Sequence, residues 1–240
     1  IRKDRDEDGH LLENVAVLEG HDNEGKYHLS LSIYLSHTYH TSTHFTVKRV
    51  DWSSNGELIA TCGRDKTVWI WEVGDAEECE FDCVAILTGH TQDVKSVTWH
   101  PRKEIVFSTS YDDTIRVWKS RIELDDEWHC VDVLKTHDST VWDLSFQHGT
   151  SSPSERFVTC SDDRSIIIWG PTSSSSSSCS SSKDEDETKY QVEMRVNNLH
   201  DRTIYTVDWY DHLVASGGGD NGIRIVDTSS SSSSSSPSSK

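Results

Sequence analysis

The sequence predicts an all-β protein in which one repeat occurs four times. Its hydrophobic content of 33% falls in short runs separated by Gly, Asp and Ser, which is typical of short strands rather than of long helices. The chain also contains 9 Trp residues, and three of them end the same apolar run of the repeat. No run of about 18 apolar residues occurs, so we expect no membrane-spanning helix.

The repeat is the strongest of these observations. Each copy contains a His, a strand that opens with an apolar β-branched residue, a second strand with Ser or Thr, an Asp turn and a third, apolar strand. The copies include residues 57–71, 89–118, 136–169 and 199–226. Third strands such as VWIW and IIIW are apolar throughout, which indicates burial on both faces. We therefore predict propeller blades of four antiparallel strands, each packed between two neighbours.

Four positions align across the copies, and their side chains can form a hydrogen-bonded series within one blade. They are His90, Ser108, Asp112 and Trp118, and then His137, Thr159, Asp163 and Trp169. The last copy has His200, Ser216 and Asp220, with Val226 in place of the Trp. Ser, His and Asp also occur in hydrolase triads, but their recurrence in successive repeats favours a buried structural network.

Charge and cysteine content restrict the class of protein. A formal net charge of −18, from 41 acidic and 23 basic residues, argues against a general binder of nucleic acids or anionic membranes. The 6 Cys residues form no C-x-x-C pair and no zinc-binding pattern. Together with the lack of a signal segment, they indicate a reducing compartment, the cytosol or the nucleus. The chain begins at Ile1 without an initiator Met, so we expect it to be part of a longer protein or a truncated one.

The repeats divide the chain into segments. We assign four blade segments to residues 11–73, 82–118, 129–169 and 190–227. Residues 173–189 form a loop of Ser followed by acidic residues, and residues 229–240 form a Ser-rich tail. These two segments contain too little apolar area to offset the entropy cost of ordering, so we predict that both are disordered.

Residues 25–46 interrupt the first copy. Its spacing from His to Asp is longer than in the second copy, and removing these residues aligns the two copies without a gap. Codons for Gly25–Tyr27 can contain a splice-donor sequence, and codons for Thr46–Val47 can contain an acceptor. We interpret the segment as a retained intron; a genuine surface insertion is the alternative. For this reason we do not interpret the following residues as a metal cluster: Tyr27, His28, His37, His40 and His44.

The residues between the aligned positions resemble one group of WD40 proteins. The stretches LIATCGRDKTVWIWEV, HTQDVKSVTWHP, STSYDDTIRVWK, DDEWHCVDVL and THDSTVWDLSF are similar to the WD40-repeat protein of the cytosolic iron–sulfur protein assembly (CIA) machinery. The resemblance covers residues 11–24 and 47–169 well, and 190–227 more loosely. It implies a WD40 β-propeller of seven blades, of which the four copies are the third to the sixth. It also implies that the aligned His, Ser or Thr, Asp and Trp form the structural tetrad of WD40 repeats.

The resemblance further implies a function. The family protein is a non-catalytic scaffold of the complex that delivers iron–sulfur clusters to cytosolic and nuclear apoproteins. Its partners are a small subunit, a large helical-repeat subunit and the client apoproteins, including their C-terminal tails. The scaffold does not itself need to ligate the cluster, so no cofactor is expected. The scattered cysteines of this chain agree with that expectation.

Six side chains are candidates for a protein-binding surface. Arg64 and Tyr111 each precede the Asp of a turn between the second and third strands, so they should lie at one edge of a blade. Four others follow the apolar residue that opens a first strand, which places them near the same edge: Lys48, Lys95, Trp142 and Tyr205. Such residue types anchor interfaces, and a basic and aromatic edge favours an acidic or carboxylate-ended partner segment. Arg64 also resembles a functionally important arginine of the family; the alternative is that it pairs with an acidic loop of the chain.

Two other functional classes predict features that differ from those of this sequence. A WD40 adaptor of another complex, such as a ubiquitin-ligase substrate receptor or a chromatin-associated protein, predicts an added recruiting segment, and none is visible. An enzyme predicts a nucleophile elbow, a P-loop, an H-E-x-x-H motif or a paired-cysteine metal site, and none occurs. Four blades do not close a seven-blade ring. We therefore expect exposed apolar faces at both ends, with aggregation or dimerisation as the consequence.

Overall fold

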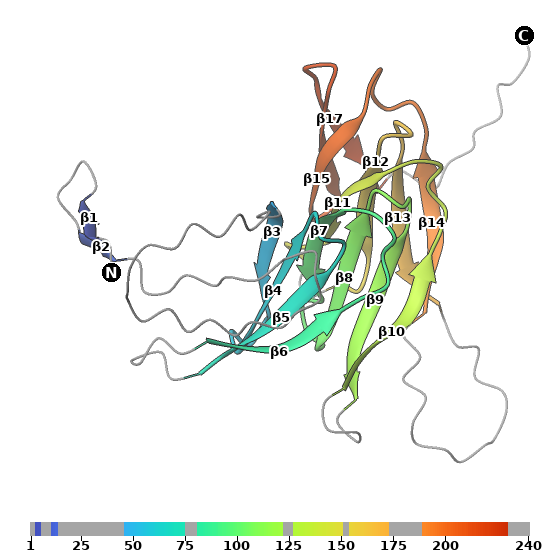
Figure 1. Ribbon diagram of the computed structural model, residues 1–240. Coiled ribbons are helices and arrows are strands. Elements are labelled where there is room, and N and C mark those ends of the chain that lie inside the picture. Colours follow the sequence, from blue (N-terminus) through green and yellow to red (C-terminus); the bar gives the residue numbers. More distant parts are fainter. Residues whose placement is uncertain are drawn as a thin grey trace, which may run out of the picture.

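The computed structural model describes residues 3–5, 11–13, 46–74, 81–121, 127–150, 154–172 and 189–229. Four antiparallel sheets follow one another along the chain as blades of a β-propeller (Figure 1). This confirms the all-β propeller predicted from the repeat. A separate two-stranded sheet of β1 (Lys3–Arg5) and β2 (Leu11–Glu13) precedes them. In the part of the chain that the structure describes, no helix is long and apolar enough to cross a membrane.

The strands pair in chain order within each blade, so every blade is an antiparallel meander. Blade 1 contains β3 (Val47–Trp52), β4 (Leu58–Gly63), β5 (Val68–Val73) and β6 (Phe81–Leu87). Blade 2 contains β7 (Val94–Trp99), β8 (Ile105–Ser110), β9 (Ile115–Arg121) and β10 (Glu127–Leu134). Blade 3 contains β11 (Val141–Phe146), β12 (Phe157–Ser161), β13 (Ile166–Pro171) and β14 (Tyr190–Val196). In blade 4 the described strands are β15 (Ile204–Tyr210), β16 (Leu213–Gly218) and β17 (Ile223–Asp227).

The sequence repeat and the blade are offset by one strand. The segment that begins near residue 82 opens with β6, yet β6 pairs with β5 in the sheet of blade 1. Likewise β10, at the start of the third segment, pairs with β9 in blade 2. Each of the last three repeats therefore supplies the outermost strand of one blade and three strands of the next, which connects neighbouring blades covalently.

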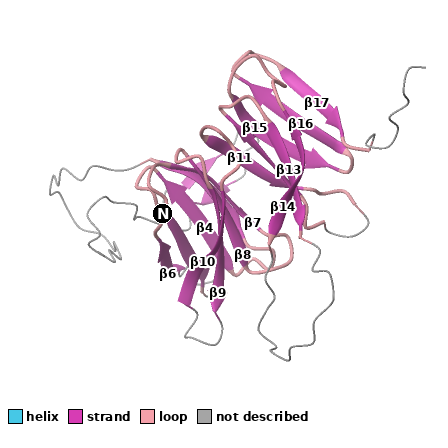
Figure 2. Ribbon diagram, turned by 90° about the vertical axis from the view of Figure 1, so that its right-hand side faces the viewer, coloured by secondary structure: helices cyan, strands magenta, loops and turns pink. Residues whose placement is uncertain are grey.

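The innermost strands β3, β7, β11 and β15 gather at the centre of the molecule, and the outermost strands β6, β10 and β14 lie farther out (Figure 1). Seen from the side, blades 1 and 4 lie at opposite ends of the row of sheets (Figure 2). All of the predicted insertion 25–46 except Thr46 lies outside the described residues, as do 173–188 and 230–240 of the two predicted disordered segments.

The apolar cores lie between blades, because the third strand of a blade has apolar side chains on both faces. In β13, Ile167 and Trp169 belong to the core shared with blade 2, whereas Ile166 and Ile168 belong to the core shared with blade 4. The core between blades 2 and 3 also contains an aromatic cluster. The ring centroid of Phe107 lies 5.2 Å from that of Phe146 and 5.1 Å from that of Phe157. Each blade thus depends on its neighbours for burial.

Candidate protein-binding site

In blade 2 the four aligned residues form one hydrogen-bonded series. Trp118 Nε1 donates to Ser108 Oγ at 2.8 Å. Ser108 Oγ lies 2.7 Å from His90 Nε2, and His90 Nδ1 lies 2.9 Å from Asp112 Oδ2. This order fits a neutral imidazole that accepts from the Ser108 hydroxyl and donates to the carboxylate. Burial lowers the pKa of His90, in keeping with the neutral form. Burial alone would raise the pKa of Asp112, but hydrogen bonds from His90 and Thr114 outweigh it and hold that pKa far below its usual range.

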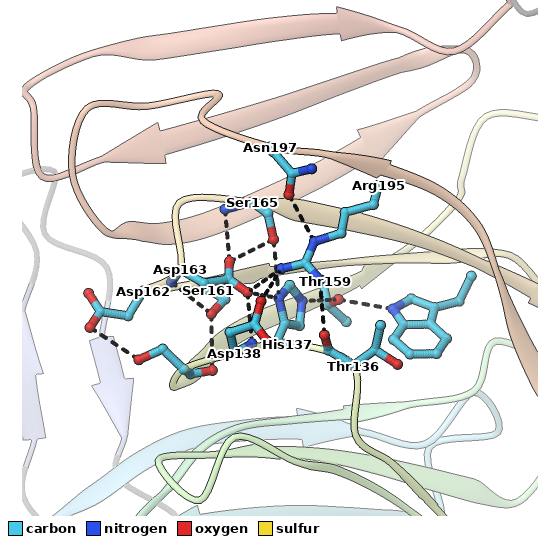
Figure 3. Close-up of polar contacts among 12 residues, drawn as sticks. Thr136, His137, Asp138, Thr159, Ser161, Asp162, Asp163, Ser165, Arg195 and Asn197 are labelled. Carbon is cyan, nitrogen blue, oxygen red and sulfur yellow. Dashed lines mark hydrogen bonds and ion pairs between the residues drawn. The ribbon is translucent and has the colours of Figure 1, made fainter.

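Blade 3 contains the same series (Figure 3). His137 Nδ1 lies 2.9 Å from Asp163 Oδ2, and His137 Nε2 lies 2.9 Å from Thr159 Oγ1. The Thr159 hydroxyl oxygen also accepts a hydrogen bond from Trp169 Nε1 at 3.0 Å. Arg195, on the outermost strand β14, adds an ion pair of 3.1 Å to the Asp163 carboxylate. Arg195 was not predictable from the sequence, because its partner is distant in the chain and nothing in its local pattern sets it apart.

Blades 4 and 1 contain shorter versions of this network. In blade 4, His200 Nδ1 lies 2.9 Å from Asp220 Oδ1 and His200 Nε2 lies 2.9 Å from Ser216 Oγ. Val226 in β17 replaces the Trp, so no indole completes the series there. In blade 1, Trp71 Nε1 donates to Thr61 Oγ1 at 3.0 Å. The aligned His21 lies outside the described residues.

These networks accompany a backbone contact that defines one edge of every blade. The first residue of the turn between the second and third strands donates its N–H to the carbonyl just before the innermost strand. The pairs are Arg64 to Thr46 (3.1 Å), Tyr111 to Asp93 (2.9 Å), Asp162 to Thr140 (3.0 Å) and Gly219 to Thr203 (2.8 Å). We call this edge the rim. The fixed contact places the turn residue beside the start of the innermost strand in all four blades.

Each innermost strand contains a β-bulge at the rim. The pairing with the second strand skips one residue in each blade: Lys48 in β3, Lys95 in β7, Trp142 in β11 and Tyr205 in β15. A bulged residue has no partner opposite it, and the bulge redirects its side chain out of the regular alternation. These are the four residues that the sequence placed near the edge of the blade. The β-bulge is the physical reason for their common position.

Four of the six candidate residues form a continuous contact across blades 2 to 4, which we call the aromatic row: Tyr111, Lys95, Trp142 and Tyr205. The Lys95 ammonium lies 5.1 Å from the ring centroid of Tyr111 and 5.0 Å from that of Trp142. The rings of Trp142 and Tyr205 meet edge to face with centroids 5.1 Å apart. Lys95 Nζ is also 3.3 Å from Asp93 Oδ2, and the Lys95 side chain is only 10% exposed. The Lys95 charge is therefore held within the row by cation–π contacts and one ion pair.

The other two candidates, Lys48 and Arg64, lie on the rim of blade 1, and both are exposed. Among the residues that the structure describes, neither side chain has a hydrogen bond or an ion pair. The alternative partner for Arg64, the acidic loop after β5, lies outside the described residues at 75–80. The candidate residues on the rim thus change from two exposed cations in blade 1 to mostly aromatic side chains in blades 2 to 4, whereas the turn residue of blade 3, Asp162, is acidic and exposed.

One buried carboxylate beneath the rim joins all four innermost strands. Asp143 follows Trp142 in β11, and its side chain is 7% exposed. It pairs with Arg49 Nη1 at 2.8 Å and accepts hydrogen bonds from Ser96 Oγ at 3.1 Å and Thr206 Oγ1 at 3.0 Å. The three donors occupy the matching positions of β3, β7 and β15. The contacts of Asp143 with three other strands were not predicted from the sequence. The only signal there is an Asp inside a strand that is otherwise mostly apolar.

The described residues offer little for metal binding or hydrolysis. Within them, no group of three or more His, Cys, Asp or Glu side chains is arranged to hold a metal ion. Burial raises the pKa of the Cys62 thiol to about 12, so the metal-binding thiolate is disfavoured there. At the end of the innermost strands opposite the rim, Ser145 Oγ and Asp208 Oδ1 lie 3.4 and 3.1 Å from the same atom, His148 Nε2. A Ser-His-Asp relay requires the two partners on different ring nitrogens, so this cluster is not one. The networks of His90, His137 and His200 do have that arrangement, but the hydroxyl of each is at a buried residue, out of reach of a substrate.

Comparison with known proteins agrees with this architecture. The WD40 family profile, described as WD domain, G-beta repeat, matches residues 33–72, 81–119 and 128–170, more than half of the chain. A protein of Vanderwaltozyma polyspora named "Probable cytosolic iron-sulfur protein assembly protein 1" is 39% identical over 90% of this chain and 52% of its own length. Proteins of the same name from Botryotinia fuckeliana and Candida albicans are 32% and 37% identical, over 94% and 88% of this chain and 52% of each relative. The chain therefore spans about half the length of these curated relatives. Blade topology and profile match together place the chain in the WD40-repeat family.

Proposed function

We propose that the chain is a non-catalytic protein-binding scaffold of the machinery that assembles cytosolic iron–sulfur proteins. The observation behind the proposal is that similar proteins from three fungi bear that name, at identities from 32% to 39% over most of this chain. A WD40 fold alone is compatible with many functions, so the similarity to these particular relatives supplies the specificity. In this proposal the chain acts in the cytoplasm, with the nucleus as a second location.

The docking surface in this proposal lies on the rim. Its side chains are those of the six candidate residues: Lys48, Arg64, Lys95, Tyr111, Trp142 and Tyr205. The free cations of blade 1 attract acidic groups, while the aromatic row offers a large contact area with little conformational freedom to lose. Because the whole chain has a net charge of −18, the two exposed cations Lys48 and Arg64 also orient an acidic partner segment toward the rim of blade 1.

The partners in this proposal are the small subunit and the large helical-repeat subunit of the targeting complex, together with apo iron–sulfur client proteins. The cluster is the cargo of the machinery, and the scaffold contributes the relative positions of client and partners. No cofactor of its own is needed for this role.

The proposal includes a larger ring, in which the four blades are the third to the sixth of seven. Its support is the apolar surface at both ends of the row of blades, where Trp52 is 53% and Ile223 is 76% exposed. Residues 25–46 are proposed to be intron sequence retained in the chain. Sequencing the transcript tests this point: a mature messenger RNA that keeps these codons would show a genuine insertion.

Co-purification tests the proposed complex. The tagged chain is expressed in a eukaryotic cell, and the captured proteins are identified by mass spectrometry. We expect subunits of the iron–sulfur targeting complex and apo client proteins. Recovery of ubiquitin-ligase or chromatin subunits in their place would overturn the proposal in favour of another WD40 adaptor.

Arg64→Glu tests the rim as the docking surface. Replacing a free cation by an anion turns attraction of an acidic segment into repulsion, so we expect association to weaken about ten-fold or more. Arg102→Glu is the control for charge reversal away from the rim. Arg102 is 44% exposed, pairs with Glu155 at 3.3 Å, and lies in the turn after β7, at the opposite edge of its blade. Equal binding of both variants in a quantitative pull-down would remove Arg64 from the docking surface.

A further inference from the structure

One hydrogen-bond donor in the middle of the aromatic row has no acceptor among the described residues. It is Trp142 Nε1, which is buried. Other indole N–H groups of the protein do have one: those of Trp69, Trp71, Trp99, Trp118, Trp169 and Trp209. A buried donor without an acceptor destabilises a folded protein and is rare, so its position calls for a physical explanation.

The surroundings of Trp142 differ from those of the paired indoles. Its ring is covered by the Lys95 ammonium, 5.0 Å from the centroid, and by the edge-to-face contact with Tyr205. Tyr205 is 50% exposed, and within the described residues its hydroxyl makes no hydrogen bond. The Tyr205 side chain can therefore turn aside without losing a hydrogen bond, which is the movement that access of a partner to the indole requires.

We propose that the Trp142 indole N–H is reserved for a partner and donates to a carboxylate oxygen of an acidic partner segment. This inference rests on the proposed docking role of the rim. A carboxylate fits better than a neutral acceptor, because the Lys95 ammonium lies 5.0 Å from the centroid of the ring and has donors left beside its ion pair with Asp93. The cost of the unpaired donor in the free protein is recovered when the partner binds, so Trp142 determines specificity for an acidic segment.

Thermal unfolding tests the unpaired donor without any partner. Trp142→Phe removes the N–H and keeps an aromatic ring. Trp69→Phe is the matched control, because Trp69 is also partly buried but its N–H donates to Thr67 Oγ1 at 2.8 Å. We expect Trp142→Phe to melt about 2 to 4 °C above Trp69→Phe. Equal losses in both variants would show that the Trp142 N–H is already satisfied, for example by water, and would overturn the inference.

A nuclear magnetic resonance titration tests the acceptor. The probe is a tetraglutamate peptide with blocked termini, and blocked tetraglutamine is the control. The indole resonance of Trp142 is assigned by its absence in Trp142→Phe. We expect a saturable downfield shift of this N–H proton with tetraglutamate and none with tetraglutamine. No shift, or an equal shift with both peptides, would overturn the assignment of a carboxylate; the latter would indicate a backbone carbonyl.

Association with the captured partners separates this inference from the proposed function. If the wild-type chain does not bind the targeting complex, the proposed function fails, while the peptide titration still decides the role of Trp142. If the wild-type chain binds, we expect Trp142→Phe to weaken binding about ten-fold or more. Unchanged binding of Trp142→Phe would overturn the reserved donor and leave the scaffold role intact.

Discussion

The innermost strands of blades 1 and 2 have nearly the same sequence, VKRVDW and VKSVTW, but opposite environments. Trp99 in blade 2 is 4% exposed, whereas the matching Trp52 in blade 1 is 53% exposed. The other end of the row shows the same contrast, since Ile223 in blade 4 is 76% exposed and the matching Ile115 in blade 2 is 1% exposed. The difference shows that the apolar residues on the face of a blade are not buried by that blade itself. A neighbouring blade buries them, and its presence decides what each residue contributes to stability.

Truncation of the two matching tryptophans is the strongest test of this comparison. Trp99→Ala removes a ring packed between two blades, so we expect a loss of about 3 to 5 kcal/mol in the free energy of unfolding. Trp52→Ala removes an exposed ring and should change that free energy by about 0.5 kcal/mol or less. Urea denaturation of both variants provides the measurement. A large loss in Trp52→Ala would mean that blade 1 is covered in solution, for example by a second copy of the chain.

The dependence of stability on pH tests the hydrogen-bonded network of blade 2. His90 has a lowered pKa when folded, so the unfolded chain binds its proton more readily. The His90 contribution is therefore complete above the unfolded pKa of about 6.5 and is lost as the pH falls through it. The lowered pKa of Asp112 acts in the same direction, and its contribution is lost as the pH falls below about 3.9. We expect the denaturation midpoint to fall between pH 7 and 5, as judged by urea titrations at each pH.

His90→Gln is the control for this pH dependence, because Gln does not titrate. The decline between pH 7 and 5 should become shallower in the variant, while the steeper loss near pH 4 remains. A midpoint in the wild-type chain that rises as the pH falls would contradict the neutral imidazole in the blade 2 network.

The smallest expected effect compares two bulged lysines at the rim. Lys95 lies between two aromatic rings and beside Asp93, so Lys95→Gln should lower the free energy of unfolding by about 1 kcal/mol. Lys48 is exposed in the matching bulge, and Lys48→Gln should change stability by about 0.5 kcal/mol or less. Matched urea titrations measure the difference. Equal effects of both substitutions would show that the cation–π contacts of Lys95 add nothing measurable.

Part of the candidate site followed from the sequence. The position after the apolar residue that opens an innermost strand was enough to place Lys48, Lys95, Trp142 and Tyr205 at one edge, because the repeat keeps the same strand start in every blade. The contact of Lys95 with two rings was not predictable. It joins side chains from blades 2 and 3, and their distance depends on how the sheets stack. The sequence placed Lys95 on a basic and aromatic edge, and the structure adds that its charge is held by two rings and Asp93.

By itself, the sequence determined the repeat, the order of strands and the residues of the hydrogen-bonded networks. These features are local, since each network is assembled within one blade from residues that recur at similar spacing. Only the tertiary structure decided which tryptophans are buried, that Asp143 joins four strands, and that the Trp142 N–H has no acceptor in the described part of the chain. Those properties depend on contacts between blades. Such contacts are set by the packing of one sheet on the next, and no pattern within a single repeat encodes that geometry.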